Sequence, residues 1–247
     1  MKISNFRLGI GVPSSWEHVT FPFFTSFIQM ERPDFEFIPV TNGPIDAMRC
    51  VIAEQALRLG CSHLLMLDTD HVLHPQTVTK LLANDVDICG AMTYKRYPPF
   101  DPILLKGTIK GYRYIYPKRG DTDLVEVDGV GAAILMIKTE VFENIQKPWF
   151  KFEKFSEDDD RPIGEDLYFC WKAKQAGYKI HVDPSIPCGH ITKMVVDYDF
   201  FEMYNQSKWV ELVCKENKIT TKEQFVNMLK DMTKNPELRK YLDEDGL

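Results

Sequence analysis

The chain has 247 residues, of which 44% are hydrophobic and 27% charged, and this composition predicts a globular protein with one sizeable core. Its formal net charge of −6 gives no global electrostatic reason to bind nucleic acid or an anionic membrane, although this charge does not exclude a local basic patch. No segment approaches the ~18–20 apolar residues that span a bilayer. The N-terminus carries no signal-peptide pattern, and the six cysteines are scattered with no Cys-x-x-Cys pair, so we expect reduced thiols in a cytoplasmic protein.

The first half of the chain alternates short apolar runs with helical patterns. We expect strands at 7–12, 35–40, 64–67 and 88–92, and helices at 44–59 and 75–82. Gly60 is expected to end the first of these helices, and Pro13, Ser14 and Ser15 to break the first strand into a loop. Strands that alternate with helices predict an α/β layer with a mostly parallel sheet.

The middle of the chain changes character. The runs 103–105, 112–116 and 124–127 are short, rich in β-forming residues and separated by turns, so antiparallel or mixed strands are expected. The run 129–137 opens with small residues and predicts one more buried strand.

The following elements are expected in order: a helix at 139–145, an aromatic loop (Trp149, Phe150, Phe152, Phe155), an exposed and mobile acidic run at 156–164, a helix at 165–176 capped by Gly177, a strand at 178–182 and a loop at 188–190. From Asp199 onward the pattern is helical and amphipathic, with polar interruptions near 218–221 and 234–236. We therefore expect a catalytic domain at 1–198 and a helical extension at 199–247.

The stretch HLLMLDTDHVL (63–73) places two carboxylates, Asp68 and Asp70, directly after a buried run. Asp-x-Asp recurs at five other places, mostly in polar company, so only this pair needs a special explanation. Alternate residues of an extended chain point the same way, and ligands of open α/β sheets bind beyond the carboxyl ends of the strands. A divalent cation such as Mg²⁺ or Mn²⁺, shared with a diphosphate, would relieve the repulsion between the two carboxylates. The alternative is structural: Asp70 caps the next helix and Asp68 hydrogen-bonds to the loop.

A second polar cluster lies in PIGEDLYFCWKAKQAGYKIHVDPSIPCGHI (162–191). Glu165 and Asp166 fall in the first turn of the expected helix, where negative side chains also suit the helix dipole, so capping alone could explain them. His190 alone could be an ordinary loop histidine. The order of the segments, from the strand with its Asp-Thr-Asp end to the final Cys-Gly-His, makes a long pattern.

That pattern resembles GT-A-fold glycosyltransferases, similar to the family 2-like enzymes of bacteria and phages. The resemblance spans about residues 6–195 and lies in LLMLDTD, ICGAMTYKR, VDGVGAAILMIKTEVFENIQKPWF and GEDLYFCWKAKQAGYKIHVDPSIPCGH. It implies a mixed, Rossmann-like sheet flanked by helices, with the helical C-terminal extension appended. It also implies transfer of a sugar from a UDP- or GDP-linked donor to an acceptor hydroxyl.

The resemblance assigns roles to particular residues. Asp68 and Asp70 would form the Mn²⁺ or Mg²⁺ motif, with Thr69 between them against the donor, and His190 would complete the metal site. Asp166 matches the catalytic base of the inverting members. Pro13 and Ser14, after the first strand, would lie beside the nucleotide.

For two further groups of residues, an ordinary structural role is an alternative to a role in donor binding. Asp46 and Arg49, on the helix before the metal motif, would contact the nucleotide, or they are surface helix residues. Gly131, with Ala132 and Ala133, would let the sugar approach the backbone, or these small residues serve strand packing.

Two features depart from the family. Pro-Ser-Ser follows the first strand where many members have an acidic cluster, so the nucleobase is not determined. The basic and aromatic run 93–99 lies where a donor or acceptor could bind, or is a solvated loop.

The strongest rival enzyme is a haloacid-dehalogenase-type phosphatase, in which Asp68 would be the nucleophile and Asp70 an acid/base. Against it, the motif follows two αβ elements, and Gly164-Glu165-Asp166 follows a charged loop rather than an apolar run. A non-catalytic module that binds a nucleotide or glycan, or a nucleotidyltransferase, is also left open. The acceptor could be a glycan, a lipid, a protein or a modified nucleic-acid base, and the C-terminal helices could make a homo-oligomer.

Overall fold

The computed structural model describes residues 6–15, 18–154, 162–193, 197–216, 218–221, 223–224 and 226–227. The chain separates into two compact units, Met1–Thr192 and Lys193–Leu247. The expected Phe155, the acidic residues 156–161 and the polar interruption at 234–236 lie outside the described residues.

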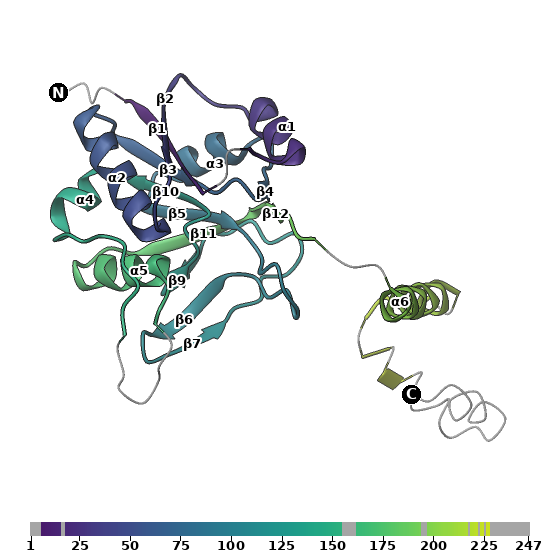
Figure 1. Cartoon of the computed structure of the whole chain (residues 1–247). Coiled ribbons are helices and arrows are strands. Elements are labelled where there is room, and N and C mark those ends of the chain that lie inside the picture. The colour runs from purple at the N-terminus through teal and green to yellow at the C-terminus, as the bar shows by residue number, and fades with distance from the viewer. Residues whose placement is uncertain are drawn as a thin grey trace. The chain divides into compact units, whose positions relative to one another are not determined.

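Strands and helices alternate in the first part of the unit, up to β5 (Ile88–Met92), and six consecutive strands, β5 to β10 (Ile134–Lys138), fill its middle, as expected (Figure 1). The strands are β1 (Leu8–Ser14), β2 (Phe35–Thr41), β3 (His63–Leu67), β4 (His71–Val72), β5 (Ile88–Met92), β6 (Leu104–Thr108), β7 (Gly111–Tyr114), β8 (Val125–Val127), β9 (Gly129–Val130), β10 (Ile134–Lys138), β11 (Ile180–Pro187) and β12 (Gly189–His190). The helices are α1 (Phe21–Gln29), α2 (Ile45–Arg58), α3 (Thr77–Ala83), α4 (Glu140–Asn144) and α5 (Glu165–Gln175).

A seven-stranded sheet in the order β2-β1-β3-β10-β5-β11-β8 forms the centre of the unit. The pairs β1–β2, β1–β3 and β5–β11 are parallel, whereas β10 and β8 run antiparallel to their neighbours. The mixed α/β architecture predicted from the sequence is confirmed. Two small sheets, β12-β4 and β7-β6-β9, lie beside it.

Helices cover both faces of the central sheet (Figure 1). Buried residues of α2, α4 and α5 form one core, and those of α1 and α3 form the other. The expected aromatic loop supplies the first core with Trp149 and Phe150, which are buried, whereas Phe152 is exposed. Gly11 lets α2 approach β1 closely, because a Cβ atom at this position would lie 2.1 Å from Cγ2 of Ile52.

Two sequence expectations are corrected. Pro13 and Ser14 do not break the first strand: β1 continues to Ser14 and pairs with β2, Pro13 opposite Val40. The ladder between β1 and β3 ends at Gly11, so Pro13 lies where β1 has only one neighbouring strand, an edge position that tolerates proline.

The expected single strand at 129–137 is two strands in different sheets. β9 pairs with β6, and β10 pairs with β3 and β5. Residues 131–133 carry the chain from one sheet to the other, and the carbonyls of Ala132 and Ala133 accept hydrogen bonds from Arg49 and from the Asp68 N–H.

Three elements were not predicted: α1, β4 and β12. The signal for α1 was present in the sequence, because Thr20 caps its first turn through a hydrogen bond from the Phe23 N–H and Pro22 lies in that turn. The two-residue strands β4 and β12 have no periodicity to detect, and residues 188–190 had been expected as a loop.

The second unit contains α6 (Tyr198–Glu216), a helix that begins close to the predicted start at Asp199. No described helix is both long and apolar enough to cross a membrane. The predicted roles of 199–247 and of a homo-oligomer stay predictions.

Candidate active site

Asp70 lies between two histidines at the carboxyl end of β3. His71 Nδ1 is 2.9 Å from Asp70 Oδ1, and His190 Nε2 is 3.1 Å from Asp70 Oδ2. The two imidazole rings stack with their centroids 4.2 Å apart. β4 and β12 create this arrangement, because His190 is directly opposite His71 in their antiparallel ladder and opposite residues project to the same face.

The histidines control the ionisation of Asp70. Burial works against the charged carboxylate, but the hydrogen bonds and charges of His190 and His71 outweigh it and hold the pKa of Asp70 well below its usual range. The hydrogen bond that His190 makes to Asp70 raises the pKa of His190, with desolvation opposing it.

The ring nitrogens of His190 have distinct partners. His190 Nδ1 lies 2.7 Å from the Tyr94 carbonyl oxygen, which can only accept, so Nδ1 carries a proton. Nε2 then faces a carboxylate oxygen, and the pair needs either a second proton or a shared metal ion. His71 is 1% exposed, and its Nε2 has no partner among the described residues.

Asp70, His71 and His190 each offer one ligand atom, and these atoms lie within 4.8 Å of one another. Two imidazoles and one carboxylate suit Mn²⁺ better than Mg²⁺, which prefers oxygen ligands.

Asp68 has a different environment from Asp70. Arg49 Nη2 donates to both oxygens of Asp68, at 3.0 Å each, while Nε donates to Glu165 at 3.1 Å. Arg49 Nη1 donates to the Ala132 carbonyl oxygen at 3.1 Å, and the Asp68 N–H donates to the Ala133 carbonyl. The buried Arg49 thus ties together α2, the end of β3, the 131–133 crossing and the start of α5.

Asp166 lies in the first turn of α5, next to Glu165. Burial raises the pKa of Asp166 to about 7, and the neighbouring Glu165 adds to the rise while Arg49 opposes it. The Leu167 N–H donates to Oδ1, so one oxygen serves the helix start as the capping alternative expects. The other oxygen, Oδ2, lies near Gly131, 3.7 Å from where a Cβ atom of that residue would be.

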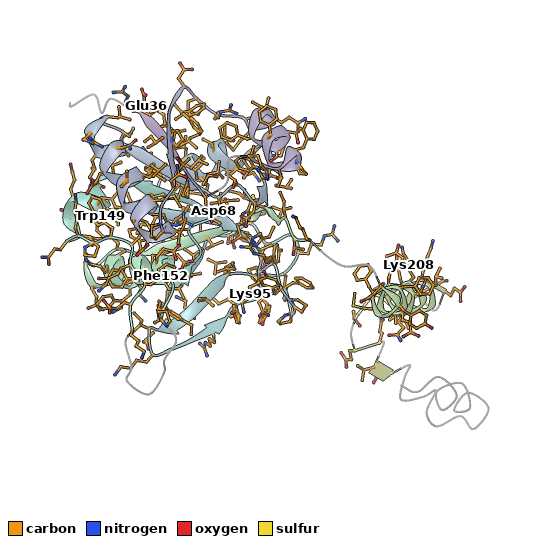
Figure 2. All side chains as sticks on the ribbon, in the orientation of Figure 1. Glu36, Asp68, Lys95, Trp149, Phe152 and Lys208 are labelled. Carbon is orange, nitrogen blue, oxygen red and sulfur yellow. The ribbon has the colours of Figure 1, made fainter. Side chains whose placement is uncertain are left out.

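These groups line one cavity of about 190 Å³ at the carboxyl end of β3. Its lining residues are Ile45, Arg49, Asp68, Asp70, His71, Arg96, Ile103, Gly131, Ala132, Ala133, Glu165, Asp166 and His190. Figure 2 labels Asp68 beside the sheet and Lys95 toward the β6–β7 hairpin. The cavity brings together side chains that are more than a hundred residues apart in the chain.

The structure brings together most of the sequence-predicted residues. Asp68, Asp70, Arg49, Gly131, Asp166 and His190 line the cavity. Pro13, Ser14, Asp46 and Thr69 do not: Asp46 is in the first turn of α2, and Pro13 and Ser14 end β1. Asp70 does not cap the next helix, whose N-cap, Gln76, makes no side-chain capping bond.

Three polar cavity residues were missed: His71, Glu165 as a partner of Arg49, and Arg96, whose Nη2 is 3.4 Å from Asp70 Oδ2. A signal existed for His71, which adjoins the acidic pair, and for Arg96, which belongs to the basic run 93–99. Nothing local marks Glu165 as the buried partner of an arginine on another helix.

No family model and no curated protein sequence matches the chain. Among solved structures, A197 from STIV is similar with a TM-score of 0.55 and 19% identity, over 76% of this chain and 87% of A197. GalNAc-T7, crystallised with UDP, GalNAc and Mn²⁺, is similar with a TM-score of 0.55 and 12% identity, over 76% of this chain and 44% of GalNAc-T7. Structural similarity at identities this low is evidence for the fold alone. The first unit therefore has a GT-A-like fold.

Proposed function

We propose that the protein is a metal-dependent glycosyltransferase that moves a sugar from a UDP- or GDP-linked donor to an acceptor hydroxyl with inversion. The observation that carries the proposal is the clustering of Asp70, His71 and His190 beside the raised-pKa carboxyl of Asp166, in one cavity of a GT-A-like sheet. The phosphatase alternative has less support, because both oxygens of its proposed nucleophile, Asp68, are engaged by Arg49.

Asp70, His190 and His71 are the residues that would hold the divalent ion. Asp68, which the sequence had suggested as a further ligand, instead has both oxygens hydrogen-bonded by Arg49. When bound, the ion would neutralise charge on the departing diphosphate. His190 is oriented for this role by the Tyr94 carbonyl, which fixes the proton on Nδ1 and leaves Nε2 toward Asp70.

Asp166 would act as the general base. The acceptor oxygen forms a bond to the anomeric carbon, its proton moves to the Asp166 carboxylate, and the bond from that carbon to the diphosphate oxygen breaks with its electron pair leaving on the diphosphate. A pKa of about 7 suits this task, because the group is then largely ionised slightly above neutral pH and still basic enough to take a proton.

Arg49 would position the neighbouring carboxylates, Asp68 and Glu165, rather than bind the donor itself. Its ion pairs with Asp68 and Glu165 fix the strand end against the start of α5, so the metal side and the base side of the cavity keep one geometry. Asp68 and Thr69, with Pro13, Ser14 and Asp46, are proposed to contact the nucleotide, and Gly131 to give room for the sugar.

A panel of UDP- and GDP-sugars, screened by thermal shift with and without Mn²⁺, tests the donor class, because a ligand that binds only the native state raises its apparent stability. Release of free nucleotide from the stabilising donor then separates an enzyme from a binding module. Stabilisation without turnover in the presence of any acceptor would favour the non-catalytic alternative.

A further inference from the structure

One segment of this acidic protein is strongly basic. Residues 93–119, called here the basic segment, contain seven Lys and Arg and a single carboxylate, whereas the whole chain has 30 Lys and Arg against 36 Asp and Glu. The segment covers the loop after β5, the β6–β7 hairpin and the residues that follow it. Its charge is therefore opposite to that of the rest of the molecule.

Most of these charges are free to meet a ligand. Lys110, Arg113, Lys118 and Arg119 are exposed, and no carboxylate of the described residues forms an ion pair with them. Arg113 is also directly opposite Lys106 in the β6–β7 ladder, so two cations lie on one face of the hairpin. Lys106 already has Glu126 and Asp128 within 4.0 Å of its Nζ, so Arg113 is the cation of this pair that an anionic ligand would neutralise.

Aromatic rings accompany the cations. Half of the ten tyrosines are in the basic segment (Tyr94, Tyr97, Tyr112, Tyr114, Tyr116). Tyr97, Tyr116 and Phe100 are 69%, 64% and 44% exposed. Lys95 Nζ lies 4.3 Å from the centroid of the Tyr114 ring, and the hydroxyl of Tyr116 donates to Asp101.

The basic segment reaches the cavity. Arg96 lines it and lies 3.4 Å from Asp70, while its guanidinium is also 5.9 Å from the ring centroid of the exposed Tyr97. A strand bound along the basic segment would therefore pass the mouth of the cavity, where an acceptor hydroxyl is needed.

We propose that the basic segment binds a single-stranded nucleic acid and that this strand carries the acceptor. Cations that track phosphates, combined with rings on which bases stack, are the two elements of single-strand binding. A glycan is less well matched, because the segment contains no Asn, Gln, Glu, Ser or His, and its one carboxylate, Asp101, already accepts from Tyr116 and pairs with Lys95. A duplex hides its base faces and cannot use the exposed rings. The acceptor role of the strand rests on the proposed glycosyltransferase function, whereas the binding of the strand does not.

The test is fluorescence anisotropy of the full-length chain, without donor or metal, with a labelled thymine DNA strand. A strand of about 20 nucleotides exceeds the roughly 4–16 that one small domain covers. Competitors are an RNA strand of equal length, the DNA duplex, heparin and phosphatidylglycerol vesicles. Variants are Arg113→Gln, Lys118→Gln with Arg119→Gln, and Tyr97→Ala. Arg58→Gln is the matched control, since Arg58 is exposed at the end of α2, outside the basic segment.

We expect the single strands to bind and to compete best, with log K falling linearly against log salt. Each lost phosphate contact should reduce that slope by about 0.7 and weaken binding several-fold. Tyr97→Ala should weaken it about fivefold or more, and Arg58→Gln should leave it unchanged.

The proposal is overturned if the DNA strand does not bind, or if Arg58→Gln weakens binding as much as Arg113→Gln. It is also overturned if heparin, vesicles or duplex compete as well as single strands and Tyr97→Ala has no effect, because the segment is then a general anion or membrane surface. Thermal stabilisation by the donor with Mn²⁺ is measured separately. Failure of nucleic-acid binding and failure of donor binding can therefore be told apart.

Discussion

His71 and His190 are directly opposite each other in a two-strand ladder, and their stacked rings both face the carboxylate of Asp70. We therefore expect His71→Ala to lower Mn²⁺ affinity at least about tenfold, by analogy with lost metal-site partners. Electron paramagnetic resonance of free Mn²⁺ measures this without any catalytic assay.

His74 provides a matched control for the histidine experiment, because it lies after β4 and does not line the cavity. His74→Ala should bind Mn²⁺ like the wild type. Equal Mn²⁺ affinity in His71→Ala and the wild type would remove His71 from the ligand set and leave Asp70 and His190.

The Arg49 network should dominate local stability. Arg49→Ala would leave Asp68 and the buried Glu165 without their cation, and removing one partner of a buried ion pair costs about 3–5 kcal/mol. Urea unfolding measures the loss. Lys179→Gln, which breaks an exposed pair with Glu126, is the control and should leave the unfolding midpoint unchanged. A similar midpoint for both variants would contradict the positioning role of Arg49.

Protonation of Asp166 should cause the fall of the reaction rate on the acidic side of its pH profile. With its pKa raised from 3.8 to about 7, the carboxylate loses its proton as pH rises through 7, so kcat/KM should fall below that pH. Asp166→Asn should retain Mn²⁺-dependent donor binding and lose transfer. Normal turnover in Asp166→Asn would make the base assignment wrong and favour a retaining mechanism.

The same raised pKa predicts a stability effect of known sign. The folded state holds this proton more tightly than the unfolded state, so the stabilisation is full below about pH 4 and is lost as pH rises through 7. Asp166→Asn should therefore melt above the wild type at pH 8, with the difference shrinking toward pH 4. Melting curves at both pH values check this sign, and a difference that grows toward pH 4 would contradict it.

Gly131→Ala tests whether Gly131 leaves room in the cavity for the donor sugar. A Cβ atom there would meet Ile103 and Asp166 Oδ2 at 3.6 and 3.7 Å, which are ordinary contacts, so Gly131→Ala should fold normally. The added methyl would occupy the cavity, and KM for the donor should rise while the melting temperature stays constant. Gly11→Ala provides the contrast, because its Cβ would clash with Ile52 at 2.1 Å and should lower the melting temperature without involving the site.

Strands that are marked by a local apolar run in the sequence were predicted correctly. The residues 88–92 form a strand with the predicted ends, and the apolar run before Asp68 is the buried β3. The division of 129–137 between two sheets could not be predicted, because β9 and β10 differ only in which distant strands they meet.

The site divides in the same way. Asp70 and Asp166 stand out because carboxylates follow an apolar run or open a helix. The partnership of His71 with His190 depends on a ladder between strands of two residues each, far apart in the chain. Likewise, Arg49 looks like a polar residue of an amphipathic helix, and only the assembled core places it 3% exposed between two carboxylates.

The most direct test of the glycosyltransferase account is titration of Mn²⁺ and UDP, and separately Mn²⁺ and GDP, into the wild type and Asp70→Ala, followed by calorimetry. The account predicts that at least one nucleotide diphosphate binds the wild type tightly only with Mn²⁺, and that Asp70→Ala abolishes this metal dependence. Equal nucleotide binding with and without metal, unchanged in Asp70→Ala, would contradict it.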